Sequence, residues 1–369
     1  MVVQPCAVEG LAVNTQFWSG KRVLLTGHTG FKGSWLSLWL QKMGASVAGY
    51  ALPPGPGDSL FELASVAKDM DISVYADVRH LDRLNEVIGD FRPEIVFHLA
   101  AQPLVTVSYL KPMETFQINV MGTVNILEAV RRSACCRVVV MITSDKCYQN
   151  SEWVWGYRES DPLGGRDPYS SSKGCAELVT AAYRQSFFGT GGANQVAIAT
   201  ARAGNVIGGG DFSKDRLVPD VMAAALSNRP LRVRCPDAVR PWQHVLEPLS
   251  GYLILAEMLW NDPTRYSQSW NFGPLQNDSR SVRLVLETLS DCWGRRIPWE
   301  LDSEPVPHEA HLLTLDSAKA RALLGWKPRW NLERALQAVV EWYRAYKGNE
   351  PLRELVMQQI ASYEVPCTR

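Results

Sequence analysis

The sequence predicts an α/β fold in which helices cover both faces of a doubly wound parallel sheet, with a smaller α/β domain attached. Short apolar runs of strand length recur at 22–26, 46–50, 72–75, 94–102, 137–143 and 195–202. Stretches with helical periodicity separate most of these runs, and such alternation is typical of βαβ units. After about residue 205 the alternation stops, so the later chain is expected to form most of the smaller domain.

The first βα unit is the clearest functional signal. A strand over 22–26 and a helix over 34–43 flank a turn with a glycine at every third position. In such a turn, backbone N–H groups and the positive end of the helix converge where a pyrophosphate can lie. The spacing is not that of a P-loop, since Lys32 is followed by glycine. A glycine-rich turn without a ligand is the alternative. The residues expected to bind the cofactor here are Gly27, His28, Thr29, Gly30, Phe31, Lys32 and Gly33.

The end of the second strand indicates which dinucleotide would bind. An acidic side chain about 20 residues after the glycines favours NAD, because it can hydrogen-bond the adenosine ribose. Here Tyr50 and Ala51 occupy that place, and the next carboxylate is Asp58. No Lys or Arg occurs between Lys42 and Lys68, so nothing nearby would neutralise a 2′-phosphate. On balance the pattern favours NAD over NADP.

The third and fourth strands end in further candidate contacts. Asp77, the acid after the third strand, could reach the adenine amino group. It could instead be an ordinary acid at the N-terminal end of a helix over 81–88. Mostly small side chains after the fourth strand would let a flat ring lie against the backbone, and a tight strand end explains them equally. His98 on this apolar run is expected to be a buried histidine and not a catalyst. The expected cofactor contacts are Asp77, Val78, Leu99, Ala100, Ala101 and, inside a long helix over 113–134, Asn119; Gln102 is expected at the substrate.

The fifth strand delivers a polar triplet, Ser144, Asp145 and Lys146, at its carboxyl end. In open α/β sheets, ligands bind at that edge. An ordinary polar turn is the alternative. The position at a strand end favours a catalytic triplet.

A helix beginning with Asp167 as its cap places Tyr169 and Lys173 four residues apart on one face. A phenol has an unperturbed pKa near 10 and is a poor base at neutral pH. We expect Lys173 and a nicotinamide cation to lower the pKa of Tyr169 so that it can exchange a proton with substrate. The motif Y-x-x-x-K is common, and it gains weight here because it follows five βα-like units and a strand-end serine.

The chain after the sixth strand contains candidate substrate contacts in loops and short strands. Helices are expected near 218–227, 246–260, 281–292, 316–324 and 331–347. Asn205 follows the sixth strand, while Arg216 and Arg240 are candidates for binding a diphosphate, because guanidinium groups match phosphate geometry. For either arginine, an ordinary ion pair is the alternative.

The composition excludes several classes of protein. The formal net charge is zero, which gives no global attraction to nucleic acid or to a membrane surface. The eight cysteines form no C-x-x-C pair and no zinc-like spacing with histidines, so no metal site is expected and a reducing, cytoplasmic setting fits. No secretory signal in the first 20 residues and no membrane-spanning run is recognisable.

With these residues in hand, the sequence resembles the extended short-chain dehydrogenase/reductase family, and within it the nucleotide-sugar 4,6-dehydratases. The resemblance rests on residues 26–36, 143–148, 168–173 and 203–211, and covers about 17 to 347. The combination of HTGFKGSW at 28–35 with TSDKCY at 143–148 is its most specific part, and implies CDP-glucose as substrate. It further implies a Rossmann-type NAD-binding domain over 17–205 with later strands from about 240–275, a substrate-binding domain mainly over 206–350, and a homodimer made by the 113–134 and 168–188 helices.

The resemblance also implies roles for the site residues. Tyr169 would be the redox base, Ser144 would hydrogen-bond the sugar hydroxyl, and Lys173 would hold the phenol and the nicotinamide ribose. Asp145 would protonate the departing 6-hydroxyl. Related dehydratases carry glutamate as the base next to or at that position, whereas this chain has Lys146. The base for the C5 proton therefore stays open between Lys146 and another group.

Two other functions compete with this interpretation. A sugar-nucleotide 4-epimerase or decarboxylase shares the first hydride transfer, but the acid and lysine beside Ser144 disfavour a simple epimerase. A non-catalytic NAD-binding module has no need for Ser144, Tyr169 and Lys173 together. Loss of water from a candidate sugar nucleotide would distinguish the dehydratase from both.

Overall fold

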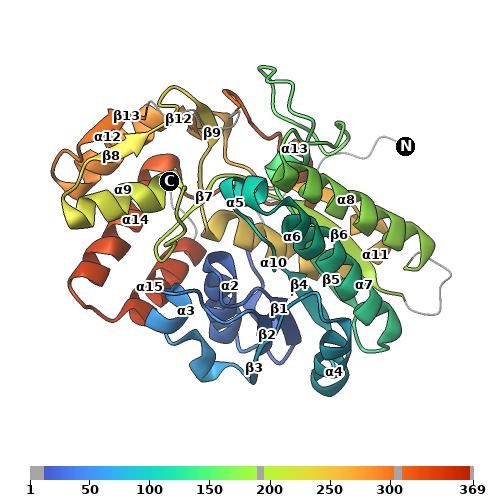
Figure 1. The fold of residues 1–369 in the computed structure, drawn as a ribbon. Helices are drawn as coiled ribbons and strands as arrows, with labels where there is room; N and C mark the ends of the chain where they lie inside the picture. Colours follow the sequence, from blue (N-terminus) through green and yellow to red (C-terminus); the bar gives the residue numbers. More distant parts are fainter. Residues whose placement is uncertain (1–11, 189–194, 303–309, 366–369) are drawn as a thin grey trace.

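The computed structural model describes residues 12–188, 195–302 and 310–365, which are built on a seven-stranded sheet (Figure 1). The strand order is β11-β6-β5-β4-β1-β2-β3, and every neighbouring pair is parallel. The predicted doubly wound α/β fold is confirmed. The seven strands are β1 (Arg22–Thr26), β2 (Ser46–Ala51), β3 (Ile72–Tyr75), β4 (Ile95–His98), β5 (Val138–Ile142), β6 (Ala197–Arg202) and β11 (Ser269–Asn271).

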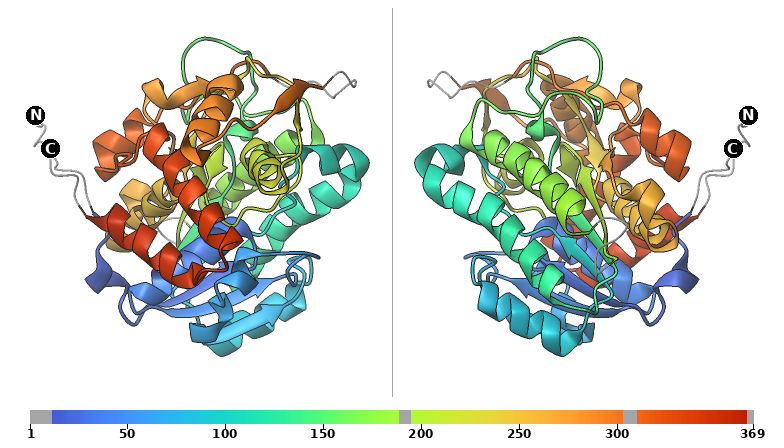
Figure 2. Two further views of the ribbon diagram at one scale, coloured as in Figure 1. Left: turned by 90° about the vertical axis from the view of Figure 1, so that its left-hand side faces the viewer. Right: turned by 90° about the vertical axis from the view of Figure 1, so that its right-hand side faces the viewer.

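Alternating side chains of the sheet enter two separate cores, as the period of a β-strand requires. In β1, Leu24 joins the core on one face, whereas Val23 and Leu25 join the core on the other. The first face is covered by α4 (Leu81–Phe91), α7 (Gly122–Arg132) and α8 (Pro168–Ser186). The second face is covered by α2 (Phe31–Lys42) and α10 (Leu246–Asn261), with α15 (Leu352–Glu364) packed on α2. Figure 2 shows the sheet with helices on both of its faces.

A second group of elements lies to the left of the large sheet in Figure 1. Its strands form two-stranded sheets: β7 (Val206–Ile207) with β10 (Gln243–His244), β9 (Val239–Pro241) with β12 (Ser279–Ser281), and β8 (Leu231–Val233) with β13 (Trp299–Leu301). Its helices are α9 (Leu217–Ser227), α12 (Val282–Trp293) and α14 (Leu332–Lys347). Because β11 joins the large sheet from late in the chain, the two groups are interleaved in sequence; the boundary near residue 205 stays a prediction.

Short elements connect these layers. They are α1 (Thr15–Trp18), α3 (Leu60–Leu63), η1 (Val66–Asp69), α5 (Val105–Leu110), α6 (Pro112–Phe116), the π-helical turn η2 (Gln117–Met121), η3 (Asp145–Cys147), α11 (Pro263–Tyr266), η4 (Gln276–Asp278) and α13 (Ala318–Leu324).

The short helices α1, α3, α5 and α11 were not predicted, and three longer helical segments differ from the sequence prediction. The first helix begins at Phe31 and not at Ser34, so its first turn lies inside the glycine stretch. The helix expected over 113–134 is divided into α6, η2 and α7, and the π-helical turn places Asn119 in the interior. Helix α15 was missed, although Leu352, Val356 and Ile360 recur at helical spacing and are buried.

Candidate active site

The glycine turn after β1 forms a tight cradle at the start of α2. Gly27 has a φ of +77°, and a Cβ there would stand 2.8 Å from the backbone nitrogen of Ala100. A Cβ on Gly33 would stand 2.1 Å from the carbonyl oxygen of Gly27. Gly30 is the N-cap, and no side chain caps the helix or adds an acid to its first turn. Uncapped N–H groups at a helix start favour an anion, so the cradle fits the pyrophosphate of a dinucleotide.

His28, Thr29, Phe31 and Lys32 fix this turn to its surroundings. The His28 ring fills a slot left by Gly49, and its Nε2 lies 2.8 Å from the Ser73 hydroxyl. Thr29 donates a hydrogen bond of 2.9 Å to the carbonyl of Leu52. A Cβ on Gly208 would stand 2.9 Å from the Phe31 ring. Binding of the cofactor by these four side chains stays a prediction.

Lys32 is half-buried and lies within electrostatic reach of the residues around Asp145 and Lys173. Burial, followed by the charges of Arg216 and Lys173, lowers the pKa of this lysine to about 8. The carboxylates of Asp145 and Asp211 act in the opposite direction. The second residue of α2 is therefore in electrostatic contact with groups that the sequence assigns to the substrate side.

The ends of β3 and β4 lie along the same edge of the sheet. Asp77 is held by Arg79, whose Nε and terminal nitrogen approach its oxygens at 3.0 and 2.6 Å, and this interaction lowers the pKa of the carboxyl group. Asp77 lies before α4 but does not cap it, since His80 is the N-cap, and the predicted contact of Asp77 with adenine stays a prediction. Val78 is buried against Gly122, where a Cβ would stand 2.7 Å from it.

Asn119 and Gln102 link the β4 loop to the helix that carries the tyrosine. The Asn119 amide donates to the Gln102 carbonyl at 3.0 Å and to the Ser172 hydroxyl at 2.8 Å. The Gln102 amide donates to Thr115 at 2.9 Å and accepts from the backbone of Leu104 at 2.6 Å. Both amides are thus used within the protein. Their predicted contacts with cofactor and substrate stay predictions, as do those of Leu99, Ala100 and Ala101.

The predicted catalytic triplet lies where β5 ends. Ser144 donates a hydrogen bond of 2.9 Å to Oδ1 of Asp145, and both residues are buried. Oδ2 of Asp145 is buried without a hydrogen-bond partner and faces Gly204. Lys146 is half-buried, and its backbone N–H donates to the Ser144 hydroxyl at 3.2 Å. An unpartnered buried carboxylate oxygen is costly, so this oxygen is a natural position for a substrate hydroxyl.

Tyr169 is buried beside this triplet, and burial raises its pKa to about 12. A hydrogen bond with Ser144 and the charge of Arg216 oppose the rise. In the protein by itself desolvation dominates, and the lowering of this pKa by Lys173 together with a nicotinamide cation stays a prediction. Any further positive charge placed near the phenol would lower the pKa.

Lys173 is buried under the end of β5. Its ammonium donates a hydrogen bond of 3.4 Å to the carbonyl of Ile142. Burial lowers the pKa of Lys173 to about 8, and the neighbouring Glu177 and Cys147 raise it. The pKa of Lys173, the lysine expected to assist the phenol, is therefore not far above neutral pH.

Three of the predicted substrate residues, Asn205, Arg216 and Arg240, lie before β7, at the N-cap of α9 and in β9. Arg216 forms an ion pair of 3.0 Å with Asp211. Arg240 is buried and donates to the carbonyls of Ala310 and His311 at 2.5 and 3.3 Å. Asn205 has a φ of +42°. The ion-pair alternative describes Arg216 in this structure, and diphosphate binding by either arginine stays a prediction.

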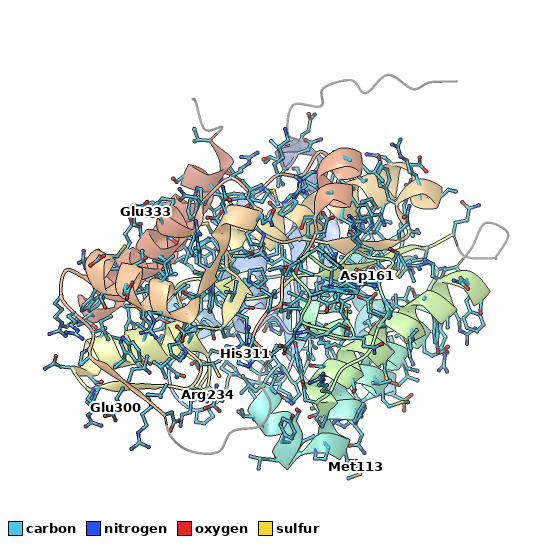
Figure 3. All side chains as sticks on the ribbon, turned by 90° about the horizontal axis from the view of Figure 1, so that it is seen from above. Met113, Asp161, Arg234, Glu300, His311 and Glu333 are labelled. Atoms are coloured by element: carbon cyan, nitrogen blue, oxygen red, sulfur yellow. The ribbon has the colours of Figure 1, made fainter. Side chains whose placement is uncertain are left out.

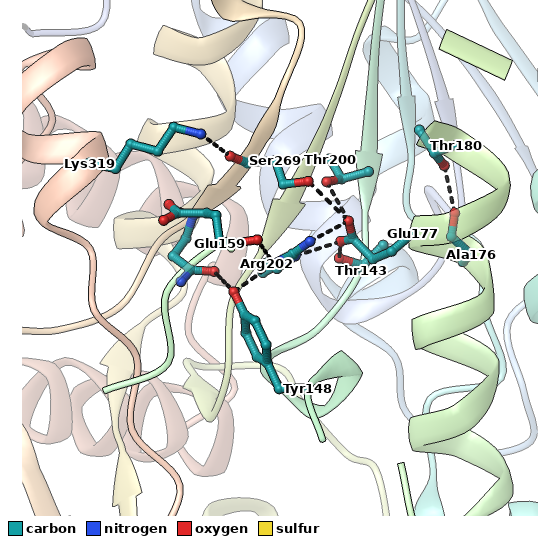
Figure 4. Close-up of polar contacts among 11 residues, drawn as sticks. Thr143, Tyr148, Glu159, Ala176, Glu177, Thr180, Thr200, Arg202, Ser269 and Lys319 are labelled. Carbon is teal, nitrogen blue, oxygen red and sulfur yellow. Dashed lines mark hydrogen bonds and ion pairs between the residues drawn. The ribbon is translucent and has the colours of Figure 1, made fainter. Parts of the chain in front are cut away.

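Two site-supporting residues were absent from the sequence prediction, Glu177 and Arg202. They form an ion pair of 2.8 Å in which each side chain is only 2% exposed (Figure 4). A signal existed, since Glu177 lies one helical turn after Lys173 and Arg202 ends an apolar strand. The contact between them could not be read from either signal alone.

The described ranges contain neither a cluster of metal ligands nor a membrane-spanning helix. Residues 12–188, 195–302 and 310–365 hold no group of three or more His, Cys, Asp or Glu side chains arranged for a metal ion. Within the same ranges, no helix has the length and apolar character needed to cross a bilayer.

Comparison with known proteins places the chain in a family. Residues 24–339 match the GDP-mannose 4,6 dehydratase family. A CDP-glucose 4,6-dehydratase of Salmonella typhimurium is 50% identical over 359 residues, covering 97% of this chain and 100% of that protein. A dTDP-glucose 4,6-dehydratase of Xanthomonas campestris pv. campestris is 25% identical over 342 residues, covering 87% of this chain and 92% of that protein.

Solved structures share the fold. The dTDP-glucose 4,6-dehydratase of Bacillus anthracis, in complex with NAD, has a TM-score of 0.74 at 21% identity and covers 91% of this chain and 100% of its own. The UDP-glucose 4-epimerase of Thermotoga maritima, with UDP-glucose, has a TM-score of 0.76 at 20% identity, with coverage of 88% and 99%. The chain belongs to the GDP-mannose 4,6 dehydratase family, within the extended short-chain dehydrogenases/reductases.

Proposed function

We propose that this chain is an NAD-dependent nucleotide-sugar 4,6-dehydratase, a hydro-lyase that converts CDP-D-glucose to CDP-4-dehydro-6-deoxy-D-glucose. The 50% identity with the Salmonella protein over both whole chains supports the substrate. The structural observation that carries the proposal is the buried Asp145, whose Oδ2 is unpartnered while Ser144 holds its Oδ1. A simple 4-epimerase loses no water and has no need for such an acid.

In this proposal the glycine turn binds the cofactor, and the residues around Ser144 and Tyr169 act on the sugar. When bound, NAD supplies a hydride acceptor for C4 of the sugar and later returns the hydride at C6. The glycine turn with the uncapped start of α2 would hold its pyrophosphate, and Lys173 its nicotinamide ribose. Tyr169 removes the proton of the 4-hydroxyl, and Ser144 holds that oxygen through its hydroxyl.

The 4-ketone that results makes the C5 hydrogen acidic, which an unsubstituted sugar carbon is not. Lys146, half-buried at the triplet, or another base removes this proton. Asp145 donates a proton to the departing 6-hydroxyl, and water leaves. A proton added at C5 completes the product, so atoms balance as loss of one water.

One assay tests this proposal. The purified protein is incubated with CDP-glucose and with its uridine, thymidine and guanosine counterparts, and the mass of each sugar nucleotide is followed. We expect loss of one water from CDP-glucose. Conversion to an isomer of unchanged mass would favour the epimerase, loss of carbon dioxide from a uronic acid the decarboxylase, and bound cofactor without any turnover a binding module.

We further propose a homodimer formed through the helices of the α8 face. Large apolar side chains are exposed there, and Figure 3 shows Met113 at the margin of the molecule. Contiguous exposed apolar surface is typical of protein interfaces. Those exposed on α5, α6, η2 and α8 are Tyr109, Leu110, Met113, Phe116, Met121 and Leu178. Light scattering should give twice the chain mass for the natural protein and a smaller mass for Met113→Lys/Leu178→Lys.

A reducing, cytoplasmic setting completes the proposal. Six cysteines in the described ranges are free, among them Cys147 in the catalytic loop. Cys6 and Cys367 lie outside the described residues. The expected setting can be checked by fractionating cells that produce the protein.

A further inference from the structure

We propose that the buried ion pair of Glu177 and Arg202 positions the 144–146 triplet and Lys173 for catalysis. This inference rests on the proposed dehydratase function. It concerns two residues that lie behind the reacting groups, so they are positioning residues and not catalytic ones.

The pair is bidentate and closed to solvent (Figure 4). Arg202 donates from Nε to one Glu177 oxygen at 2.9 Å and from a terminal nitrogen to the other at 2.8 Å. Thr200 of β6 donates to the same carboxylate at 2.7 Å. Two parallel charge-assisted hydrogen bonds fix both the distance between the two side chains and their relative orientation. The pair therefore holds α8 and β6 in a fixed relative position.

The catalytic triplet is tied to this pair at both of its ends. Before the triplet, Thr143 donates a hydrogen bond of 2.5 Å to Glu177. After it, Arg202 donates to the Tyr148 hydroxyl at 2.7 Å. The central guanidinium carbon of Arg202 also lies 4.9 Å from the centre of the Tyr148 ring. The Tyr148 hydroxyl in turn donates to Asn271 of β11 at 2.7 Å. A loop anchored at both ends to one rigid pair presents its side chains in a fixed place.

Glu177 also faces the lysine of the Y-x-x-x-K motif. It lies one turn after Lys173 on α8, and its charge raises the pKa that burial lowers. From the other elements around this lysine, Cys147 of η3 raises the same pKa, and Lys32 of α2 and His98 of β4 lie within electrostatic reach. Glu177 is therefore the carboxylate that keeps Lys173 charged at neutral pH.

Two substitutions separate charge from geometry. Glu177→Gln keeps the length and removes the charge, so the alkaline limb of the kcat/KM pH profile should move to lower pH by about one unit or more. Glu177→Asp keeps the charge but is too short to hold Thr143 and Arg202 together. It should leave the alkaline limb in place while lowering kcat by about tenfold or more.

A measurement without turnover gives the same comparison. The 13Cε resonances of the lysines can be titrated by NMR, and the signal of Lys173 identified by its loss in Lys173→Met. Its midpoint should fall in Glu177→Gln and stay unchanged in Glu177→Asp. The control is Glu247→Gln, a buried carboxylate bound by Tyr363 and by backbone N–H groups of 329 and 330, which should leave the Lys173 midpoint unchanged.

A variant that does not fold is replaced by Glu177→Gln/Arg202→Met, which removes both charges of the ion pair and should fold. It should show the same lowered alkaline limb and Lys173 midpoint. Folded variants with a kcat, alkaline limb and Lys173 midpoint like those of the natural protein would overturn the inference. Absence of dehydration by the natural protein would instead overturn the proposed function, while the Lys173 midpoint still tests the electrostatic role.

Discussion

The carboxylate of Asp145 lies against Gly204, where the Cβ of any other residue would stand 1.8 Å from its Oδ2. Asp145 is only 2% exposed, so the surrounding atoms leave its side chain little space to move. The glycine that begins the segment after β6 thus sets where the acid at the end of β5 can lie. This contact joins two motifs that are about 60 residues apart in the chain, and it gives a direct way to disturb the acid without changing it.

We expect Gly204→Ala to displace the Asp145 carboxyl group and to slow the loss of water by about tenfold or more. Oxidation at C4 should continue, so the absorbance of NADH should accumulate during turnover, as it should in Asp145→Asn. Gly89→Ala is the matched control, since a Cβ on Gly89 meets nothing within 4 Å. Unchanged turnover without NADH in both site variants would remove Asp145 from the mechanism.

Tyr169→Phe should abolish turnover and leave binding of CDP-glucose nearly unchanged, because the phenol exchanges a proton and the ring fills the same space. Isothermal titration gives the affinity, and the water-loss assay gives the rate. Tyr109→Phe, at an exposed phenol on α5, should behave like the natural protein. A Tyr169→Phe protein with a near-normal rate would exclude the tyrosine as the base.

Gly33→Ala and Gly30→Ala should separate folding from cofactor binding. A Cβ on Gly33 would overlap the Gly27 carbonyl at 2.1 Å, so this substitution should destabilise the protein by about 2 kcal/mol or more. A Cβ on Gly30 would stand 3.4 Å from the same oxygen and should be tolerated by the protein, yet it would occupy space at the uncapped helix start. Thermal unfolding and NAD titration measure the two effects. An NAD affinity of Gly30→Ala equal to that of the natural protein would argue against the pyrophosphate position.

His98 should make the fold sensitive to acid. Burial lowers its pKa to about 3, while in the unfolded chain it titrates near 6.5. The unfolded state therefore binds the proton first as pH falls below 6.5, and at pH 5 this removes roughly 2 kcal/mol of stability. His98→Asn, which can still meet the Thr26 hydroxyl, should shift acid unfolding to lower pH by circular dichroism, whereas His80→Asn at an exposed site should not. An identical acid midpoint in His98→Asn would contradict this assignment.

Much of this fold could be predicted because its signals are local. Runs such as 138–142 are apolar throughout and mostly β-branched, which indicates a strand buried on both faces, and Asp167 followed by Pro168 indicates the start of α8. The start of α2 was placed three residues late because glycine usually disfavours a helix, whereas here Gly33 is required by its contact with Gly27.

The remaining features depend on contacts between distant segments. Sequence spacing brings Tyr169 and Lys173 to one face of a helix, but only the fold reveals that Glu177 meets Arg202. Likewise, the raised pKa of Tyr169 follows from burial by the whole surrounding structure, which no short motif contains. Arg216 affects the pKa values of Lys32 and Tyr169, but its ion pair with Asp211 could be found only from coordinates, and its contact with a diphosphate stays a prediction.

The most direct test is to follow a deuterium atom placed at C4 of CDP-glucose. Internal transfer during dehydration predicts that the product has lost one water and carries the deuterium at C6, which proton and deuterium NMR can assign. An epimer with deuterium still at C4, or a dehydrated product with no deuterium at C6, would contradict the proposed reaction.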